Sequence, residues 1–190
     1  MSNRTFLLSL ANPFEELPPE TPVSPVCAAS YMIPLAWLSL FTSNDIKVRT
    51  VTSEENEPIQ YEILSCSKST ALERSKAQWA KIEMVLNTGQ ETYSKFAKFL
   101  LSLPGEFLAV ETGELWMMYD PNGFKKDLES WLATLSSDPF GKSGLFRLKK
   151  KLSPKWSSLL AQADIHLDPQ RNIEPSSIVG YSWEQPVPWE

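Results

Sequence analysis

The fold of this chain is decided by residues 46–101, which read IKVRTVTSEENEPIQYEILSCSKSTALERSKAQWAKIEMVLNTGQETYSKFAKFLL. Apolar and polar residues alternate in 46–51 and in 59–66, and this period of two predicts a hairpin of two β-strands. Apolar residues then recur at helical spacing in 70–89 and again in 93–101, which predicts two consecutive helices. Because only a few residues connect these helices, we expect them to form an antiparallel pair.

The N-terminal side adds a strand, a loop and a buried helix to this prediction. Residues 4–11 alternate like the hairpin strands and are predicted to form the first strand. Residues 12–30 contain five prolines, which lack an amide donor and fix φ, so this segment is predicted to be a loop that packs over the core. Residues 35–41, after Pro34, are apolar on nearly every side, which predicts a short buried helix.

The C-terminal side adds a second hairpin, two helices and an irregular end. The hairpin is predicted from strands at 106–111 and 114–119, which flank a Thr-Gly turn. Amphipathic patterns predict one helix over 124–136 and a shorter helix over 154–160, which begins with a proline. Residues 168–190 combine four prolines with two tryptophans, so we expect an arm that docks through its aromatic rings or awaits a partner.

These elements predict a single α+β domain over residues 1–190. Its sheet is expected to be mostly antiparallel, with the helix pair and further short helices packed against it. A chain of 190 residues, of which 42% are hydrophobic, is long and apolar enough to bury one sizeable core. Residues 168–190 are a C-terminal arm of this domain in the same prediction.

The charge pattern disfavours polyanionic partners. The net charge is −5, and the acidic residues concentrate in the segments that are predicted to form strands. Residues 1–66 hold 3 basic and 8 acidic residues, and residues 105–140 hold 2 and 7. If both segments share one sheet, their loops produce a negative field on one side of the molecule. Nucleic acid and anionic membranes would be repelled by such a field, and we expect neither as a partner.

One basic run departs from this pattern. Residues 149–151 are three lysines, with Arg147 and Lys155 nearby. Such a run has the composition of a phosphate-binding patch, and the alternative is an exposed edge that keeps the protein in solution. We favour the second interpretation.

The sequence predicts a cytoplasmic protein. The apolar run at the N-terminus ends after about seven residues, which is too short for a secretory signal. No other stretch approaches the roughly 18 apolar residues of a membrane span. Cys27 and Cys66 belong to no C-x-x-C pair, so we expect buried thiols, with one disulfide between them as the alternative.

Residues with the chemistry of a catalytic or metal site are few. The single histidine lies in a stretch where Asp164, His166 and Asp168 alternate, so an extended backbone would place all three on one face. A small hydrolase or metal enzyme built on these three residues is one alternative, and a solvated stretch after a helix is the interpretation that we favour. The run Gly-Lys-Ser at 141–143 lacks the glycine and the preceding strand of a phosphate-binding loop. We therefore expect no cofactor and no catalytic activity.

Tryptophans and carboxylates indicate a surface that binds another protein. Trp is enriched where one protein grips another, because it offers a large area at a low entropic cost. The predicted contact residues are acidic loop residues, acids around the second hairpin, and three tryptophans outside the helical core: Glu54, Glu55, Glu57, Glu111, Glu114, Asp120, Trp116, Trp183 and Trp189. Protection of sheet edges by charge and packing of the C-terminal arm are the alternatives for these residues.

Two segments carry a resemblance to a known group of proteins. Residues 2–10, SNRTFLLSL, and residues 31–35, YMIPL, resemble the opening of uncharacterised bacterial proteins that are encoded beside polymorphic or secreted toxins. Such proteins are presumed immunity proteins, which bind the cognate toxin and occlude its active site. The resemblance implies this function and this partner for the chain, and it implies no particular site residues. An adaptor or chaperone for a secreted effector is the alternative.

Overall fold

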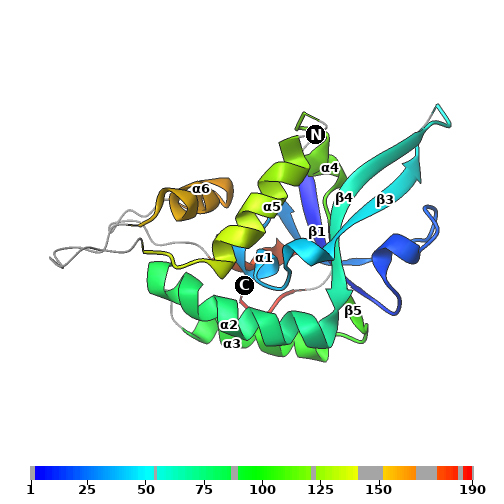
Figure 1. Ribbon diagram of the computed structural model, residues 1–190. Coiled ribbons are helices and arrows are strands. Elements are labelled where there is room, and N and C mark those ends of the chain that lie inside the picture. Colours follow the sequence, from blue (N-terminus) through cyan, green and yellow to red (C-terminus); the bar gives the residue numbers. More distant parts are fainter. Residues whose placement is uncertain are drawn as a thin grey trace, which may run out of the picture.

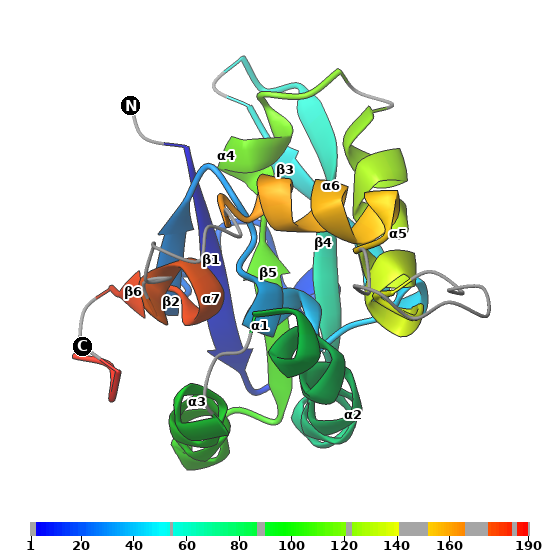
Figure 2. The ribbon, with the colours of Figure 1, turned by 90° about the vertical axis from the view of Figure 1, so that its left-hand side faces the viewer.

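A six-stranded antiparallel sheet forms the centre of the computed structural model, in the order β3-β4-β5-β1-β2-β6 (Figures 1 and 2). The structure describes residues 3–53, 55–86, 90–120, 123–140, 152–165, 175–183 and 186–189. The strands are β1 (Arg4–Leu10), β2 (Pro25–Ser30), β3 (Ile46–Thr52), β4 (Pro58–Ser67), β5 (Phe107–Glu111) and β6 (Tyr181–Ser182). The predicted α+β class, with an antiparallel sheet, is confirmed. The two acidic strand-rich segments share this sheet, because β5 pairs with both β4 and β1.

One face of the sheet is covered by the long helices (Figure 2). The helices that pack on this face are α1 (Leu35–Leu38), α2 (Lys68–Leu86), α3 (Gln90–Ser102), α5 (Gly123–Ser136), α6 (Pro154–Gln162) and α7 (Pro175–Val179). Together with Leu7, Leu64 and Val110 of the strands, they bury the larger hydrophobic core. This arrangement explains why the short helix α1 is apolar on every side, since its four residues are all fully buried.

The other face of the sheet is covered only in part. A smaller cluster is buried there, with Leu8 and Leu10 of β1, Ile63 of β4 and Phe14 from the short 3-10 helix η1 (Phe14–Glu16). Leu7 and Leu8 thus belong to two different cores, as the alternation of β1 predicts. Both faces of the central strands are apolar, but only one carries a layer of long helices (Figure 1).

The stretch that decides the fold adopts the predicted elements. β3 and β4 form a hairpin in register from Ile46 opposite Leu64 to Thr52 opposite Pro58. α2 and α3 lie side by side and antiparallel: Lys68 Nζ at the start of α2 donates to the carbonyl of Leu103, just past the end of α3. Further along the pair, the rings of Trp79 and Tyr93 stack with centroids 4.9 Å apart.

The second predicted hairpin is wrong. β5 ends at Glu111, and the next residues form the short helix α4 (Gly113–Trp116) instead of a returning strand. A returning strand would have no free neighbour, because β5 lies inside the sheet between β4 and β1. Thr112 begins the helical turn, and its carbonyl accepts a hydrogen bond from Trp116 N at 2.7 Å.

The proline-rich segment contains a strand that the sequence analysis did not predict. Its final residues form β2, which pairs with β1 from Arg4 to Leu8, whereas residues 12–30 were predicted to be a loop throughout. Pro25 is the first residue of this strand, a position where a proline costs no ladder hydrogen bond. The remainder is a loop with η1 that packs over the core as predicted, with Phe14 buried.

The C-terminal segment docks on the rest of the molecule. β6 pairs with β2 and so extends the sheet by one edge strand. Trp189 packs edge-on against Phe96 and Phe99 of α3, with ring centroids 5.7 and 5.3 Å away. Gly180 has φ of 80°, and a Cβ at this position would lie 2.5 Å from the ring of Trp37. A glycine is therefore required where this segment crosses Trp37.

None of the helices in the described ranges is both long enough and apolar enough to cross a bilayer.

Candidate functional site

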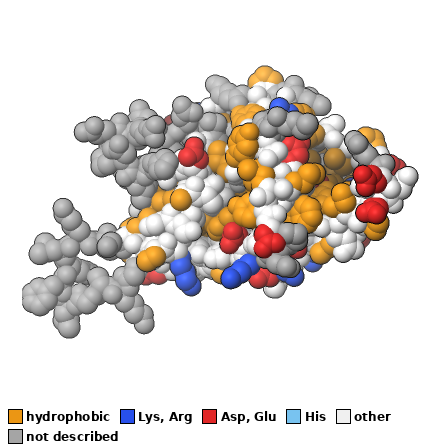
Figure 3. Space-filling model, turned by 90° about the horizontal axis from the view of Figure 1, so that it is seen from above, with side chains coloured by type: hydrophobic (Ala, Val, Ile, Leu, Met, Phe, Trp, Pro, Cys, Tyr) orange, Lys and Arg blue, Asp and Glu red, His pale blue; other side chains and the backbone are white. Residues whose placement is uncertain are grey.

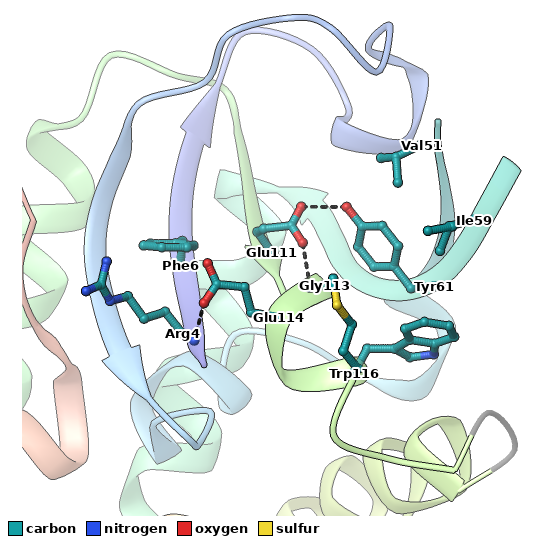
Figure 4. Close-up of a pocket in the computed structure, with 10 residues that line it drawn as sticks. Arg4, Phe6, Val51, Ile59, Tyr61, Glu111, Gly113, Glu114 and Trp116 are labelled. Carbon is teal, nitrogen blue, oxygen red and sulfur yellow. Dashed lines mark hydrogen bonds between the residues drawn. The ribbon is translucent and has the colours of Figure 1, made fainter. Parts of the chain in front are cut away.

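A pocket of about 280 Å³ opens on the partly covered face of the sheet, at the end where β5 runs into α4 (Figure 4). Four strands and α4 contribute side chains to it. The apolar lining residues are Phe6, Val51, Ile59, Tyr61, Trp116 and Met117. Two carboxylates, Glu111 and Glu114, lie among them.

The register of the sheet brings these residues together from distant parts of the sequence. Phe6 of β1 lies opposite Glu111 of β5, and Val51 of β3 lies opposite Ile59 of β4. Successive side chains of a strand point to opposite faces, so all four stand on one face. The loop that contains Phe14 covers the other end of this face, and the end beside α4 stays open.

Glu111 is held between the aromatic walls of the pocket by two hydrogen bonds (Figure 4). The hydroxyl of Tyr61 donates to its Oε2 at 2.9 Å, and the amide of Gly113 donates to its Oε1 at 2.6 Å. Burial raises the pKa of the Glu111 carboxyl, although these hydrogen bonds and the nearby charge of Arg49 act in the opposite direction. Within the described part of the chain, no cation forms an ion pair with Glu111.

Glu114 and Arg4 form the opposite wall. A carboxylate oxygen of Glu114 accepts a hydrogen bond from the backbone amide of Arg4 at 2.9 Å. The guanidinium of Arg4 lies over the ring of Trp183, 5.0 Å from its centroid, and that ring meets Phe6 edge-on at 4.9 Å. The aromatic surface therefore continues beyond the pocket to Trp183, which is 37% exposed.

Trp116 and Met117 form the rim of the pocket on the α4 side. Trp116 is half-buried and tilted against Tyr61, with ring centroids 6.3 Å apart. Met117 and Met118 follow α4 and are 71% and 52% exposed. Seen from this end of the molecule, hydrophobic side chains gather in a patch with acidic side chains beside it (Figure 3). Exposed methionines next to an apolar pocket are typical of adaptable binding surfaces.

The acidic loop between β3 and β4 lies at the same end of the sheet. Glu55 and Glu57 are exposed there, and Glu54 lies outside the described residues. The amide of Glu57 donates to Ser53 Oγ at 3.0 Å, and the amide of Ser53 donates to the Glu57 carbonyl at 2.8 Å. The strand residues nearest this loop, Val51 and Ile59, line the pocket.

The structure brings most of the predicted contact residues to this end, but not all of them. Glu111, Glu114 and Trp116 line the pocket, and Trp183 adjoins it. Asp120 is exposed beyond α4 and does not line the pocket. Trp189 lies against α3, and its Nε1 donates to the carbonyl of Gly180 at 2.8 Å. Its ring is used for docking the C-terminal segment, which is the alternative that the sequence left open.

Arg49 is an important residue that the sequence did not single out. Its guanidinium lies 4.0 Å from the centroid of the Phe14 ring and donates to the carbonyls of Phe14, Leu17 and Pro18. Only 4% of Arg49 is exposed. This contact holds the proline-rich loop over one end of the sheet face and so defines where the open end begins. The alternating pattern of β3 does not predict that this arginine is buried.

The other candidates of the sequence lie mostly outside the described residues. This is true of His166 and Asp168, of the basic residues 147 and 149–151, and of the Gly-Lys-Ser run. Asp164 is described, in a turn after α6 with φ of 52°. No cluster of metal-binding side chains occurs among the residues that the structure describes.

Cys66 carries a free thiol, so the disulfide with Cys27, which was the alternative interpretation, is not formed. Burial raises its pKa to about 12. A thiol with this pKa stays protonated near neutral pH and is a poor nucleophile.

Comparison with known proteins gives no relative: no family model, no curated protein and no solved structure matches this chain.

Proposed function

We propose that this chain is a non-catalytic binding protein that holds a protein partner against the open end of its sheet. Among the known functions of such proteins, we propose that of an immunity protein, which neutralises a cognate toxin by covering its active site. The observation that carries the binding proposal is the pocket, in which aromatic and aliphatic walls surround a held carboxylate and an exposed methionine forms the rim. The immunity role rests on the resemblance of residues 2–10 and 31–35.

Charge supports a basic partner surface. The chain carries a net charge of −5, and Glu55, Glu57 and Glu114 are exposed at the pocket end. Like charges repel an acidic protein or a nucleic acid at long range, whereas a basic cleft is attracted and steered toward this end. A toxin that acts on a polyanion has such a cleft, because it must bind negative charge itself.

The first test is co-expression with the protein that is encoded beside this chain. We expect a stable complex and rescue of growth when the neighbour is toxic. A complex without rescue of growth or loss of the neighbour's activity would favour the adaptor or chaperone instead.

A second test places the interface on the molecule. A photoreactive amino acid at Met117, on the pocket rim, should crosslink to the partner. The same group at Met84, which is 56% exposed on α2, serves as the matched control and should not crosslink. Crosslinking only from position 84 would place the partner on the helical side and overturn the proposed interface.

A further inference from the structure

We infer that the pocket binds an organic cation with an aliphatic stem, namely an arginine or lysine side chain of the partner. The inference deepens the proposed function, since the cation is taken to belong to the bound protein. Aromatic walls with a carboxylate between them are chemically suited to a monovalent cation, whose charge meets the acid and whose stem meets the rings.

The first argument is the geometry of the carboxylate. Glu111 lines the pocket, with Phe6 and Tyr61 on its two sides (Figure 4). A carboxylate has about four acceptor positions, and Tyr61 and Gly113 use one each. The Thr112 amide also acts on this carboxylate and lowers its pKa, so at least one acceptor position remains for the N–H groups of a guanidinium or ammonium. The two existing hydrogen bonds orient the carboxylate before the ligand arrives, which reduces the cost of binding.

The second argument concerns the cations of the chain itself. Two arginines stand on this face of the sheet, and both are engaged elsewhere. Arg49 donates to three carbonyls of the proline-rich loop, and the guanidinium of Arg4 lies over Trp183 at the outer side of Phe6. No described lysine or arginine forms an ion pair with Glu111, although Arg49 lies near enough for its charge to lower the Glu111 pKa. A cation from outside would supply the direct ion pair.

The third argument is size. Pockets for drug-sized ligands have volumes of roughly 300–1,000 Å³, and this pocket has about 280 Å³. This volume lies just below that range and gives room for one long side chain. The rings of Phe6, Tyr61 and Trp116 provide the apolar contact that the methylene stem of arginine or lysine makes.

The test is an NMR titration of the full chain with three small probes. n-Butylguanidinium and n-butylammonium imitate the two side chains, and n-butylurea is the neutral counterpart of the first. We expect both cations to shift the Gly113 amide and the Trp116 indole resonances with millimolar affinity, and n-butylurea to bind at least about tenfold more weakly. Equal affinities for n-butylurea and n-butylguanidinium would overturn the inference.

Variants identify the group that recognises the charge. Glu111→Gln should weaken n-butylguanidinium about tenfold and leave n-butylurea unchanged. Glu129→Gln removes an exposed carboxylate of α5, away from the pocket, and should change neither. Trp116→Leu keeps an apolar wall without the ring and should weaken the cations selectively, so the inference stays testable if Glu111→Gln does not fold.

The outcome is separable from that of the proposed function, because the titration contains no partner. If all probes bind alike while Met117 still crosslinks to the partner, the binding function stands and the pocket takes an apolar side chain. If Met117 does not crosslink, the proposed interface is wrong, whatever the probes show.

Discussion

On one face of the sheet, six helices bury Trp37, Trp156 and the inward residues of the strands almost completely. On the other face, a single loop is held down by Arg49, and a pocket remains open at one end. The same strands supply both faces through their alternating side chains. The difference teaches that the main core lies on one side of this sheet, whereas the other side carries the open pocket that we propose for binding. Substitutions on the two sides should therefore have distinguishable effects.

The largest loss of stability is expected on the helical face. Trp37 is fully buried, and its Nε1 donates to the carbonyl of Val179 at 2.9 Å. Trp37→Ala should lower the free energy of unfolding by about 3–5 kcal/mol, measured by urea denaturation. Leu101→Ala, at a residue of α3 that is 64% exposed, is the control and should cost less than about 0.5 kcal/mol. Similar losses in the two variants would contradict the assignment of the main core to this face.

A smaller and local loss is expected from Arg49→Met on the other face. The substitution removes a buried charged donor from three carbonyls, which should cost about 1.5–3 kcal/mol. Amide exchange of Glu16, Leu17 and Thr21, which donate within the loop, should accelerate more than that of α2. Lys47→Met, on the same strand and face, is the control. Uniform acceleration throughout the chain would show that Arg49 supports the whole fold rather than this loop.

The pH dependence of the free energy of unfolding, compared between the wild-type chain and Glu111→Gln, tests the burial of the pocket carboxylate. Burial raises the pKa of Glu111 above its ordinary value of 4.5, so between these two values the folded chain holds a proton that the unfolded chain has lost. The stability contributed by this group is therefore highest at low pH and falls as pH rises through the folded pKa. We expect the wild-type chain to lose stability relative to Glu111→Gln over this window. A constant difference between the two unfolding free energies would contradict the burial of this charge.

The smallest effect on stability is expected in the acidic loop. Glu55→Lys with Glu57→Lys should change the free energy of unfolding by less than about 0.5 kcal/mol, since both residues are exposed. The pair should nevertheless slow association with a basic partner roughly tenfold at low salt and reduce the salt dependence of the rate. Glu73→Lys with Glu129→Lys makes the same change of net charge on the helices α2 and α5 and is the control. Equal slowing in both pairs would indicate net charge rather than this loop.

Local periodicity was sufficient to predict much of the fold. The β3–β4 hairpin and the helices α2, α3, α5 and α6 all follow from spacings of two or of three to four residues. Each of these elements shows its buried face within its own sequence. The last residue of the apolar pattern predicted over 93–101 is an exception, because Leu101 is exposed.

The elements that were missed depend on partners far away in the sequence. β2 begins with a proline and has no alternating pattern, and its pairing with β1 decides its conformation. The segment of α4 follows a Thr-Gly turn, which predicted a returning strand, but β5 already has strands on both sides. Local pattern carries no information about which neighbours a strand will have.

The sequence predicted several residues of the candidate site, but it did not predict the pocket that they form. Glu111, Glu114 and Trp116 were selected for charge and aromatic character, and they meet at the pocket. The walls contributed by Phe6, Val51 and Ile59 were not selected, since only the strand order and register place them next to Glu111.

The crossing of Gly180 over Trp37 sets a limit on sequence variation close to the end of the chain. Any other residue would combine a left-handed backbone with a Cβ 2.5 Å from the indole, so the C-terminal segment would be displaced from the sheet edge. In a saturation-mutagenesis library selected for correctly folded molecules, this codon should be among the most depleted. Trp189, whose ring packs on α3, should be similarly intolerant of change because it holds the same segment in place.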